Sequence, residues 1–231
     1  MLSTGEGQAG QMAVLDEPAT TLAPAADEAL WAEVTPQAAR RLAVAAVQAF
    51  AEHGYHATST RDIAARAGMS PAALYIHYPS KEELLYRIAK IGYQHALGTF
   101  VRAASGAETA PQRIAALVRA LTLWHAEHHT AALAGHYEID ALAPEHRAEV
   151  DDIRRRIERI VQDAIAEGVG DEVFTVPDIR GAALAILSLT IDVARWFQYE
   201  HQRSAEQVAD LYAVLVLRML GYWGRERPVR E

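Results

Sequence analysis

The side chains of residues 54–84 include a set whose chemistry and spacing suit contact with a DNA duplex. Arg61 is best suited to a bidentate contact with guanine, because a planar guanidinium matches the two acceptors of that base. Hydroxyl, imidazole and ammonium groups that could bind phosphate oxygens come from Thr60, Tyr75, His77 and Lys81. Lys81 lies where a helix should begin, so that free backbone N–H groups would help it to hold an anion.

Two short helices are predicted to position these side chains. The first spans about 59–67 and the second about 71–77, and Gly68 with Met69 makes the tight turn between them, since glycine tolerates a positive φ. Such a pair is a helix-turn-helix, whose second helix would enter the major groove. The residues expected at the base edges are Ser70, Pro71, Ala72 and Ala73. They offer few hydrogen bonds, so base reading should depend on thymine methyl groups, on Tyr75 and on DNA shape.

This segment also resembles a known family signature. The string Gly-Tyr-x-x-Thr-Ser-x-x-x-Ile-Ala-x-x-Ala-Gly-Met-Ser-x-x-x-Leu-Tyr-x-His-Tyr-x-Ser-Lys-Glu-x-Leu at residues 54–84 looks like that of the TetR/AcrR repressors, and the resemblance extends over about 36–91. It implies an all-helical homodimer paired through its last two long helices. It also implies a ligand pocket wrapped by helices between residues 81 and 168, with movement of the helix at about 81–103 on binding. In a departure from many members, Ala72 and Ala73 replace Gly and Thr.

Helical periodicity and capping signals predict nine helices and no strand. They span about 36–53, 59–67, 71–77, 81–103, 111–128, 130–142, 145–168, 178–201 and 205–222. Ser80–Glu83 and Ser204–Gln207 match the capping-box spacing, so helices should begin there. The expected fold class is all-α. A three-helix helix-turn-helix domain at 35–91 precedes a helical effector-binding and dimerisation domain at 92–231, and residues 1–34 are predicted to be an acidic, disordered tail.

Charge and composition narrow the functional classes. The 231-residue chain has a net charge of −8, but residues 36–91 carry seven Lys and Arg against four acids, and only that segment is positive. A phosphate backbone would be attracted there alone. The absence of Cys excludes disulfides, thiolate metal sites and thiol nucleophiles. Without a signal peptide or an apolar run of membrane-spanning length, we expect a cytoplasmic protein with no membrane contact and no cofactor.

Aromatic, histidine and aliphatic side chains beyond residue 91 are candidates for a ligand pocket. They are Tyr93, Leu97, Phe100, Trp124, His125, His128, Tyr137 and Leu187. His125 with His128 or His129 could share a helical face as metal ligands, but helix-end histidines or polar pocket walls are favoured, and no metal site is predicted. The Arg-rich segment 151–159 is expected to be a solvated face. Alternatively, its arginines hold the phosphates of a coenzyme A-type ligand.

The last two predicted helices carry the apolar stripes expected of a dimer interface. The candidate interface residues are Trp196, Val208, Leu211, Tyr212, Leu215 and Met219. The alternative is that these stripes form the core of a monomer. The order of residues from Ala194 to Tyr212 faintly resembles actinobacterial TetR regulators of lipid and steroid catabolism, which implies an acyl-CoA thioester as effector.

One functional hypothesis leads and two alternatives stay open. A dimeric, ligand-responsive transcriptional repressor would bind a palindromic operator in double-stranded DNA and be released by a small apolar or acyl-CoA-type effector. One alternative is a constitutive or architectural DNA-binding protein with a filled interior. The other, an enzyme with a helical accessory domain, is disfavoured because the chain has no nucleophile elbow, phosphate loop or metal constellation.

Overall fold

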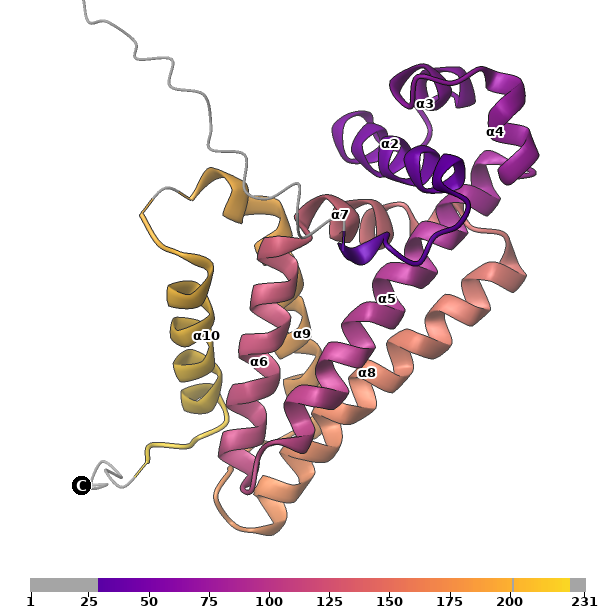
Figure 1. Cartoon of the computed structure of the whole chain (residues 1–231). Helices are drawn as coiled ribbons and strands as arrows, with labels where there is room; N and C mark the ends of the chain where they lie inside the picture. The colour runs from indigo at the N-terminus through magenta and orange to yellow at the C-terminus, as the bar shows by residue number, and fades with distance from the viewer. Residues whose placement is uncertain (1–28, 201, 225–231) are drawn as a thin grey trace, which may run out of the picture.

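Helices alone build the part of the chain that the structure describes, residues 29–200 and 202–224. Over these residues the computed structural model has nine α-helices and no strand (Figure 1). They are α2 Gln37–His53, α3 Thr60–Arg66, α4 Pro71–His77, α5 Lys81–Ser105, α6 Ala110–Glu127, α7 His129–Tyr137, α8 Pro144–Gly170, α9 Ile179–Trp196 and α10 Ala205–Met219. The predicted all-α fold class is confirmed. The prediction of a disordered tail falls largely on residues 1–28, outside the described residues.

Three helices end at least three residues earlier than predicted, and the last of them, predicted at 205–222, stops at Met219. The predicted helix at 130–142 stops at Tyr137, because the backbone at Glu138 leaves the α-helical region, and a 3-10 turn, η1 Ile139–Ala141, follows. The predicted helix at 178–201 likewise stops at Trp196 and continues as a second 3-10 turn, η2 Phe197–Tyr199. None of the helices in the described residues is long and apolar enough to span a membrane.

Side-chain caps determine where several helices begin. The Ser204 hydroxyl accepts the N–H of Gln207 while the Gln207 side chain accepts the N–H of Ser204, so the predicted capping box at α10 is formed. At α5 only half of it forms. The Ser80 hydroxyl accepts from the Glu83 N–H at 2.9 Å, whereas the Glu83 carboxylate binds Arg87.

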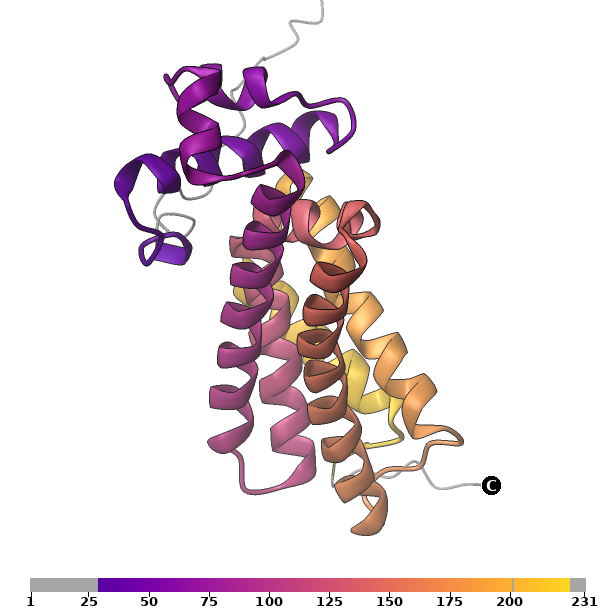
Figure 2. The ribbon, with the colours of Figure 1, turned by 90° about the vertical axis from the view of Figure 1, so that its right-hand side faces the viewer.

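The helices form a small head and a longer bundle. α2, α3 and α4 make the head, and α5 runs from its base down the length of the bundle (Figures 1 and 2). α6 and α8 pack against α5, and α9 packs against both of them. α7 lies under the head, where it contacts α2 and α5. α5 therefore belongs to both parts of the molecule.

Leu30, Trp31 and Val34 pack against the core, so the part of the predicted tail that the structure describes is attached to the fold. Trp31 is only 1% exposed, and Leu30 is also buried. The Arg40 side chain on α2 donates to the backbone carbonyls of Val34 and Ala32. Two large apolar side chains removed from water outweigh the acidic composition of this segment, since full burial of one such side chain contributes about 1.5–3 kcal/mol.

Candidate nucleic-acid interface and ligand pocket

The turn between α3 and α4 has the predicted geometry. Ser59 caps α3 with a reciprocal box to Asp62, and Ser70 caps α4, which begins at Pro71. Gly68 between them has φ +64°, a backbone conformation that residues other than glycine rarely adopt. The hydroxyl oxygens of Thr60 and Tyr75 lie 3.2 Å apart, so a side-chain hydrogen bond also joins the two helices.

Most of the predicted DNA-contacting residues lie on the surface of the head. Five of them are exposed: Arg61, Ser70, Pro71, Ala72 and Tyr75. Thr60, Ala73, His77 and Lys81 are partly buried. These nine residues come from α3, α4 and the start of α5, so all belong to the head or its junction with α5.

Arg61 differs from the other basic side chains of the head. Of the seven Lys and Arg residues between positions 36 and 91, it alone makes no hydrogen bond or ion pair with the residues that the structure describes. Arg41, for example, binds the Ala67 carbonyl, and Arg66 binds Glu52. A guanidinium with all its N–H groups available can use them on a base edge or a phosphate.

The Lys81 ammonium is engaged within the protein. Its Nζ donates to the carbonyls of Tyr55 at 2.7 Å and Thr58 at 2.8 Å, and it lies 4.1 Å from the centre of the Tyr55 ring. Partial burial lowers the pKa of Lys81. These contacts tie the first residue of α5 to the loop before α3, and they leave one N–H available for an anion.

Ile76 is an exposed residue of α4 that sequence reasoning missed. Its side chain is 78% exposed, beside Tyr75 and on the opposite side of the helix from the buried Leu74. An apolar side chain at this position could contact thymine methyl groups. The available signal was helical spacing: Leu74 faces inward, so a residue two positions later faces outward.

A cavity of about 350 Å³ lies within the bundle, among α5, α6, α7, α8 and α9. Four of the predicted pocket residues line it: Tyr93, Trp124, His125 and Leu187. The other lining residues are Ile88, Ala89, Gly92, Ala96, Leu121, Ala131, Ala132, Gly135, His136, Asp151, Arg154, Arg155, Ile157, Glu158, Leu184, Ser188 and Ile191. Its size lies within the range of ligand sites, and its walls are mainly apolar.

The other four predicted pocket residues lie elsewhere. Leu97 and Phe100 are buried in the core beyond the lower end of the cavity lining on α5. The His128 ring packs against those of Trp124 and His95. Tyr137 is half-exposed under the Arg195 guanidinium. Residue type and helical spacing predicted that these side chains face inward. The packing of five helices decides which of them face the cavity.

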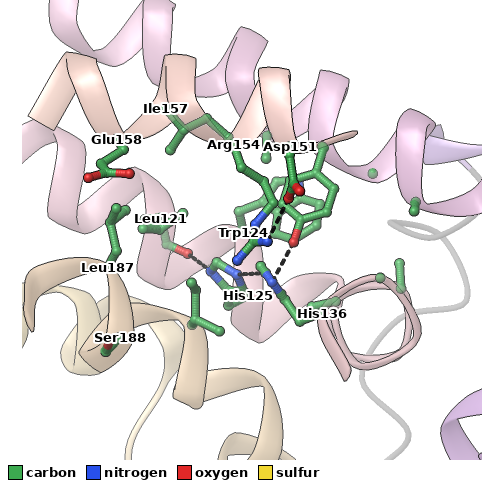
Figure 3. A pocket seen from close by; sticks show the side chains of 18 of the residues that line it. Leu121, Trp124, His125, His136, Asp151, Arg154, Ile157, Glu158, Leu187 and Ser188 are labelled. Atoms are coloured by element: carbon green, nitrogen blue, oxygen red, sulfur yellow. Dashed lines mark hydrogen bonds and ion pairs between the residues drawn. The ribbon is translucent and has the colours of Figure 1, made fainter. Parts of the chain in front are cut away.

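A chain of hydrogen bonds forms the polar wall of the pocket. His125 Nδ1 is 2.8 Å from the carbonyl oxygen of Leu121, and its Nε2 is 3.3 Å from Nε2 of His136 (Figure 3). His136 Nδ1 is in turn 2.7 Å from the Tyr93 hydroxyl. Burial lowers the pKa of His125 to about 4 and holds the pKa of His136 well below its usual value. Burial also raises the pKa of Tyr93, so all three side chains are neutral at pH 7.

Charged side chains of α8 border the same cavity. The Arg154 guanidinium is 3.0 Å from the Asp151 carboxylate, and Arg155 is 3.4 Å from Asp152. In Figure 3 Asp151, Arg154 and Glu158 project from α8 on the opposite side from Leu187 and Ser188. No group of three or more His, Asp or Glu side chains in the described residues could hold a metal ion. The pocket thus combines apolar walls with a charged border.

Apolar side chains are exposed along the last two helices. Of the predicted interface residues, Leu211, Leu215 and Met219 are exposed, and Trp196 and Tyr212 are partly buried. Leu184 and Leu189 on α9 and Val214 on α10 are further exposed aliphatic residues. Val208 is the exception. It is buried with Ala126, Val193 and Phe197, because α10 packs along α6 and its start also meets the end of α9.

Comparisons with known proteins agree with this architecture. Residues 42–88 match the bacterial regulatory proteins of the tetR family, and residues 107–220 match the tetracyclin repressor-like C-terminal domain. A crystal structure of a tetR-family regulatory protein from Rhodococcus RHA1 is 42% identical, covers 82% of this chain and all of its own, and has a TM-score of 0.78. The transcriptional repressor KstR2 of Mycolicibacterium smegmatis is 28% identical over 73% of this chain and 83% of its own.

A second solved structure shares the fold. AibR, solved in complex with isovaleryl coenzyme A and operator DNA, is 22% identical, covers 77% of this chain and 97% of its own, and has a TM-score of 0.71. The Rhodococcus and Mycolicibacterium relatives are regulators, and the Rhodococcus protein is similar over the head and the bundle together. With a helix-turn-helix head, a helical bundle and both family matches in place, the chain belongs to the TetR family of bacterial regulatory proteins.

Proposed function

We propose that this chain is a ligand-responsive transcriptional repressor that binds a palindromic operator as a homodimer and dissociates when a small apolar or acyl-CoA-type effector enters the pocket. The observation that carries the proposal is the course of α5. Its first residue, Lys81, is bonded to the head, and its segment Ile88–Ala96 lines the cavity. A ligand that fits better when α5 is displaced would therefore reorient the head. Such a ligand shifts the equilibrium only by its differential affinity for the two states.

DNA binding through the head is supported by the free guanidinium of Arg61 and by the exposed face of α4. We assign base contacts to Arg61 and to the start of α4, with Ile76 and Tyr75 beside them. We propose that Thr60 and His77 contact phosphates. The residues proposed from the start of α4 are Ser70, Pro71, Ala72 and Ala73. Because a single small head reads few bases, two heads on two half-sites are needed for a specific operator.

Dimerisation is supported by the exposed aliphatic side chains of α10. Leu211, Leu215 and Met219 follow one another at helical spacings of four, so they form one stripe. Leu189 on α9 adds a further exposed aliphatic residue. A contiguous, solvent-exposed apolar stripe of this kind is typical of a protein–protein interface. We propose that it packs against the same stripe of a second copy.

The effector class is argued from the two chemical characters of the pocket. Apolar walls suit an acyl chain, and Arg154 and Arg155 at the border could bind phosphates of a coenzyme A moiety that extends outside. AibR, which shares the fold, binds isovaleryl coenzyme A. A tenfold loss of operator affinity requires about 1.4 kcal/mol of coupling, within the range of 1–3 kcal/mol common for effectors.

The proposal is tested by fluorescence anisotropy of the purified protein on its own upstream DNA and on scrambled DNA over a range of salt concentrations. We expect tight binding with a clear preference for the upstream sequence, and release by acyl-CoA thioesters. Absence of binding at low salt, with and without those ligands, would contradict the proposal. Specific binding that no ligand relieves would favour a constitutive DNA-binding protein, although the cavity argues against that alternative.

A further inference from the structure

We infer that the pocket wall formed by Tyr93, His136 and His125 selects effectors by their hydrogen-bonding group. It accepts a hydrogen bond from a donor, such as an alcohol, a phenol or an N–H group, at the Tyr93 oxygen. It disfavours a group of equal size that can only accept. The inference rests on the proposed role of the cavity as the effector site, and it names the chemistry of the effector's buried end.

The Leu121 carbonyl sets the direction of every hydrogen bond in the series that links Tyr93, His136, His125 and Leu121. A backbone carbonyl can only accept, so the proton of His125 is on Nδ1, which is 2.8 Å from the Leu121 oxygen. Because His125 is neutral, its Nε2 carries a lone pair and accepts from Nε2–H of His136. His136 is neutral as well, so its Nδ1 accepts from the Tyr93 hydroxyl. The chain therefore runs from Tyr93 to Leu121 and cannot be reversed.

Only one bonding position is left for a ligand. Both nitrogens of His125 and both of His136 are used, and the Tyr93 proton is used as well. The Tyr93 oxygen keeps its acceptor capacity, since none of the residues that the structure describes donates a hydrogen bond to it. Tyr93, His125 and His136 all line the cavity, and the Tyr93 oxygen is the polar atom among them that has an unused bonding position.

Three other polar side chains line the cavity and differ in what they can offer a ligand. The Trp124 indole N–H is donated to His95 Nδ1 at 2.9 Å. The Arg154 guanidinium gives one N–H to Asp151 and keeps others, so the Tyr93→Phe variant below is needed to separate its contribution to ligand binding from that of Tyr93. Ser188 on α9 also lines the cavity, on the same side as Leu187 (Figure 3). A carbonyl or ether that took the Tyr93 proton would leave His136 Nδ1 buried without a donor.

That loss sets the expected selectivity. A buried polar group left without its partner costs about 1–3 kcal/mol, which corresponds to roughly 5- to 150-fold in affinity at 1.4 kcal/mol per tenfold. A ligand hydroxyl avoids the cost, because it donates to the Tyr93 oxygen and leaves the chain intact.

The test compares two ligands that differ in one proton donor, 4-hexylphenol and its methyl ether, by isothermal titration calorimetry with the full chain and no DNA. We expect the phenol to bind roughly 5- to 150-fold more tightly. Tyr93→Phe should abolish the preference. His136→Leu should weaken or reverse it, because the Tyr93 proton becomes available to the ether oxygen. Tyr86→Phe is the matched control, because Tyr86 lies on α5 outside the cavity lining and should leave the preference unchanged.

A second measurement covers the case in which a variant fails to fold. Nitrogen-15 NMR of the wild-type histidines should show His125 protonated on Nδ1 and His136 on Nε2. The opposite tautomer at either ring would overturn the inference. So would equal binding of the two ligands, tighter binding of the ether, or no binding of the phenol. Because neither measurement involves DNA, each result stands apart from the outcome on the operator.

Discussion

The imidazole of His146 lies parallel to the ring of Tyr86, with centroids 3.9 Å apart and planes 6° apart. His146 Nδ1 is also 2.9 Å from Glu82, and the Tyr86 hydroxyl donates to Glu149 at 2.6 Å. These contacts fasten the start of α8 to the start of α5, at the base of the head. Since α8 lines the pocket from Asp151 onward, displacement of α8 by a ligand would be transmitted to α5 within its first two turns.

The first prediction concerns this junction. His146→Ala should increase amide hydrogen exchange in the first two turns of α5 by about tenfold, because a hydrogen bond and a ring contact are lost at a cost of about 1–1.5 kcal/mol of local stability. Exchange measured by mass spectrometry on peptides covering residues 81–90 checks this. Peptides from α10, which does not touch His146, serve as the internal control. Unchanged exchange near Glu82 would show that the junction is held by other contacts.

Arg61→Ala should weaken operator binding by about 1–3 kcal/mol and relax the preference at one base pair. The physical reason is that Arg61 has no partner in the described residues, so its donors are available to DNA. Arg66→Ala is the matched control on the same helix. Arg66 is paired with Glu52 at the surface and should change affinity little. Anisotropy titrations on operator and random DNA separate the cases, and equal losses on both would make Arg61 a phosphate contact.

Local signals predicted the frame of the molecule well. The capping serines Ser70 and Ser204 and the turn glycine Gly68 act through groups within a few residues, so their consequences are visible in sequence. The helix-turn-helix and the positions of the nine predicted DNA-contacting residues in the head or at its junction with α5 needed no tertiary information. The hydrogen bonds of Lys81 within the protein could not be predicted from the sequence, because its two carbonyl partners lie 23 and 26 residues away along the chain.

The pocket was predicted less well, for a physical reason. His136 lies on α7 and Leu97 on α5, and the sequence does not show which helix packs over either side chain. Packing places His136 in the wall beside His125 and leaves Leu97 in the core. Trp31 was missed because acidic neighbours dominate the composition of its segment, whereas its burial depends on a site formed by distant residues.

Trp31→Ala should lower the free energy of unfolding by about 3–5 kcal/mol, the cost of removing a large buried aromatic side chain. Trp31 is almost completely buried, so the variant leaves a cavity in the core. Trp223→Ala is the matched control, since Trp223 is 44% exposed and lies under the Arg218 guanidinium in a cation–π contact. Urea unfolding followed by circular dichroism gives both values. Equal effects of the two substitutions would contradict the burial of residues 29–34.

Leu215→Glu should convert the proposed dimer into monomers. Leu215 is 53% exposed at the centre of the α10 stripe, and a glutamate there would place two unpaired charges in the interface. Burying an unpaired charge costs about 3–5 kcal/mol, so the dissociation constant should rise by at least about a hundredfold. Analytical ultracentrifugation measures it. Val101→Glu, an equally exposed position on α5, should leave the dimer intact; dissociation by both variants or by neither would remove α10 from the interface.

The neutral histidine chain predicts that the protein loses stability in acid above the pH where most carboxylates protonate. His125 has a pKa of about 4 when folded and 6.5 when unfolded, so between these values the unfolded chain binds the extra proton. The contribution of neutral His125 to the free energy of unfolding is fully present above pH 6.5. It falls by about 3 kcal/mol as the pH drops to 4. His136 acts in the same direction.

His125→Gln removes the titrating group, so the unfolding free energy of this variant should fall less steeply with decreasing pH than that of the wild type over this interval. The exposed His53→Gln should keep the wild-type slope. Equal slopes for all three proteins in urea unfolding at pH 4.5, 5.5 and 6.5 would mean that His125 is protonated in the folded state, and the hydrogen-bond directions assigned to the pocket wall would be wrong.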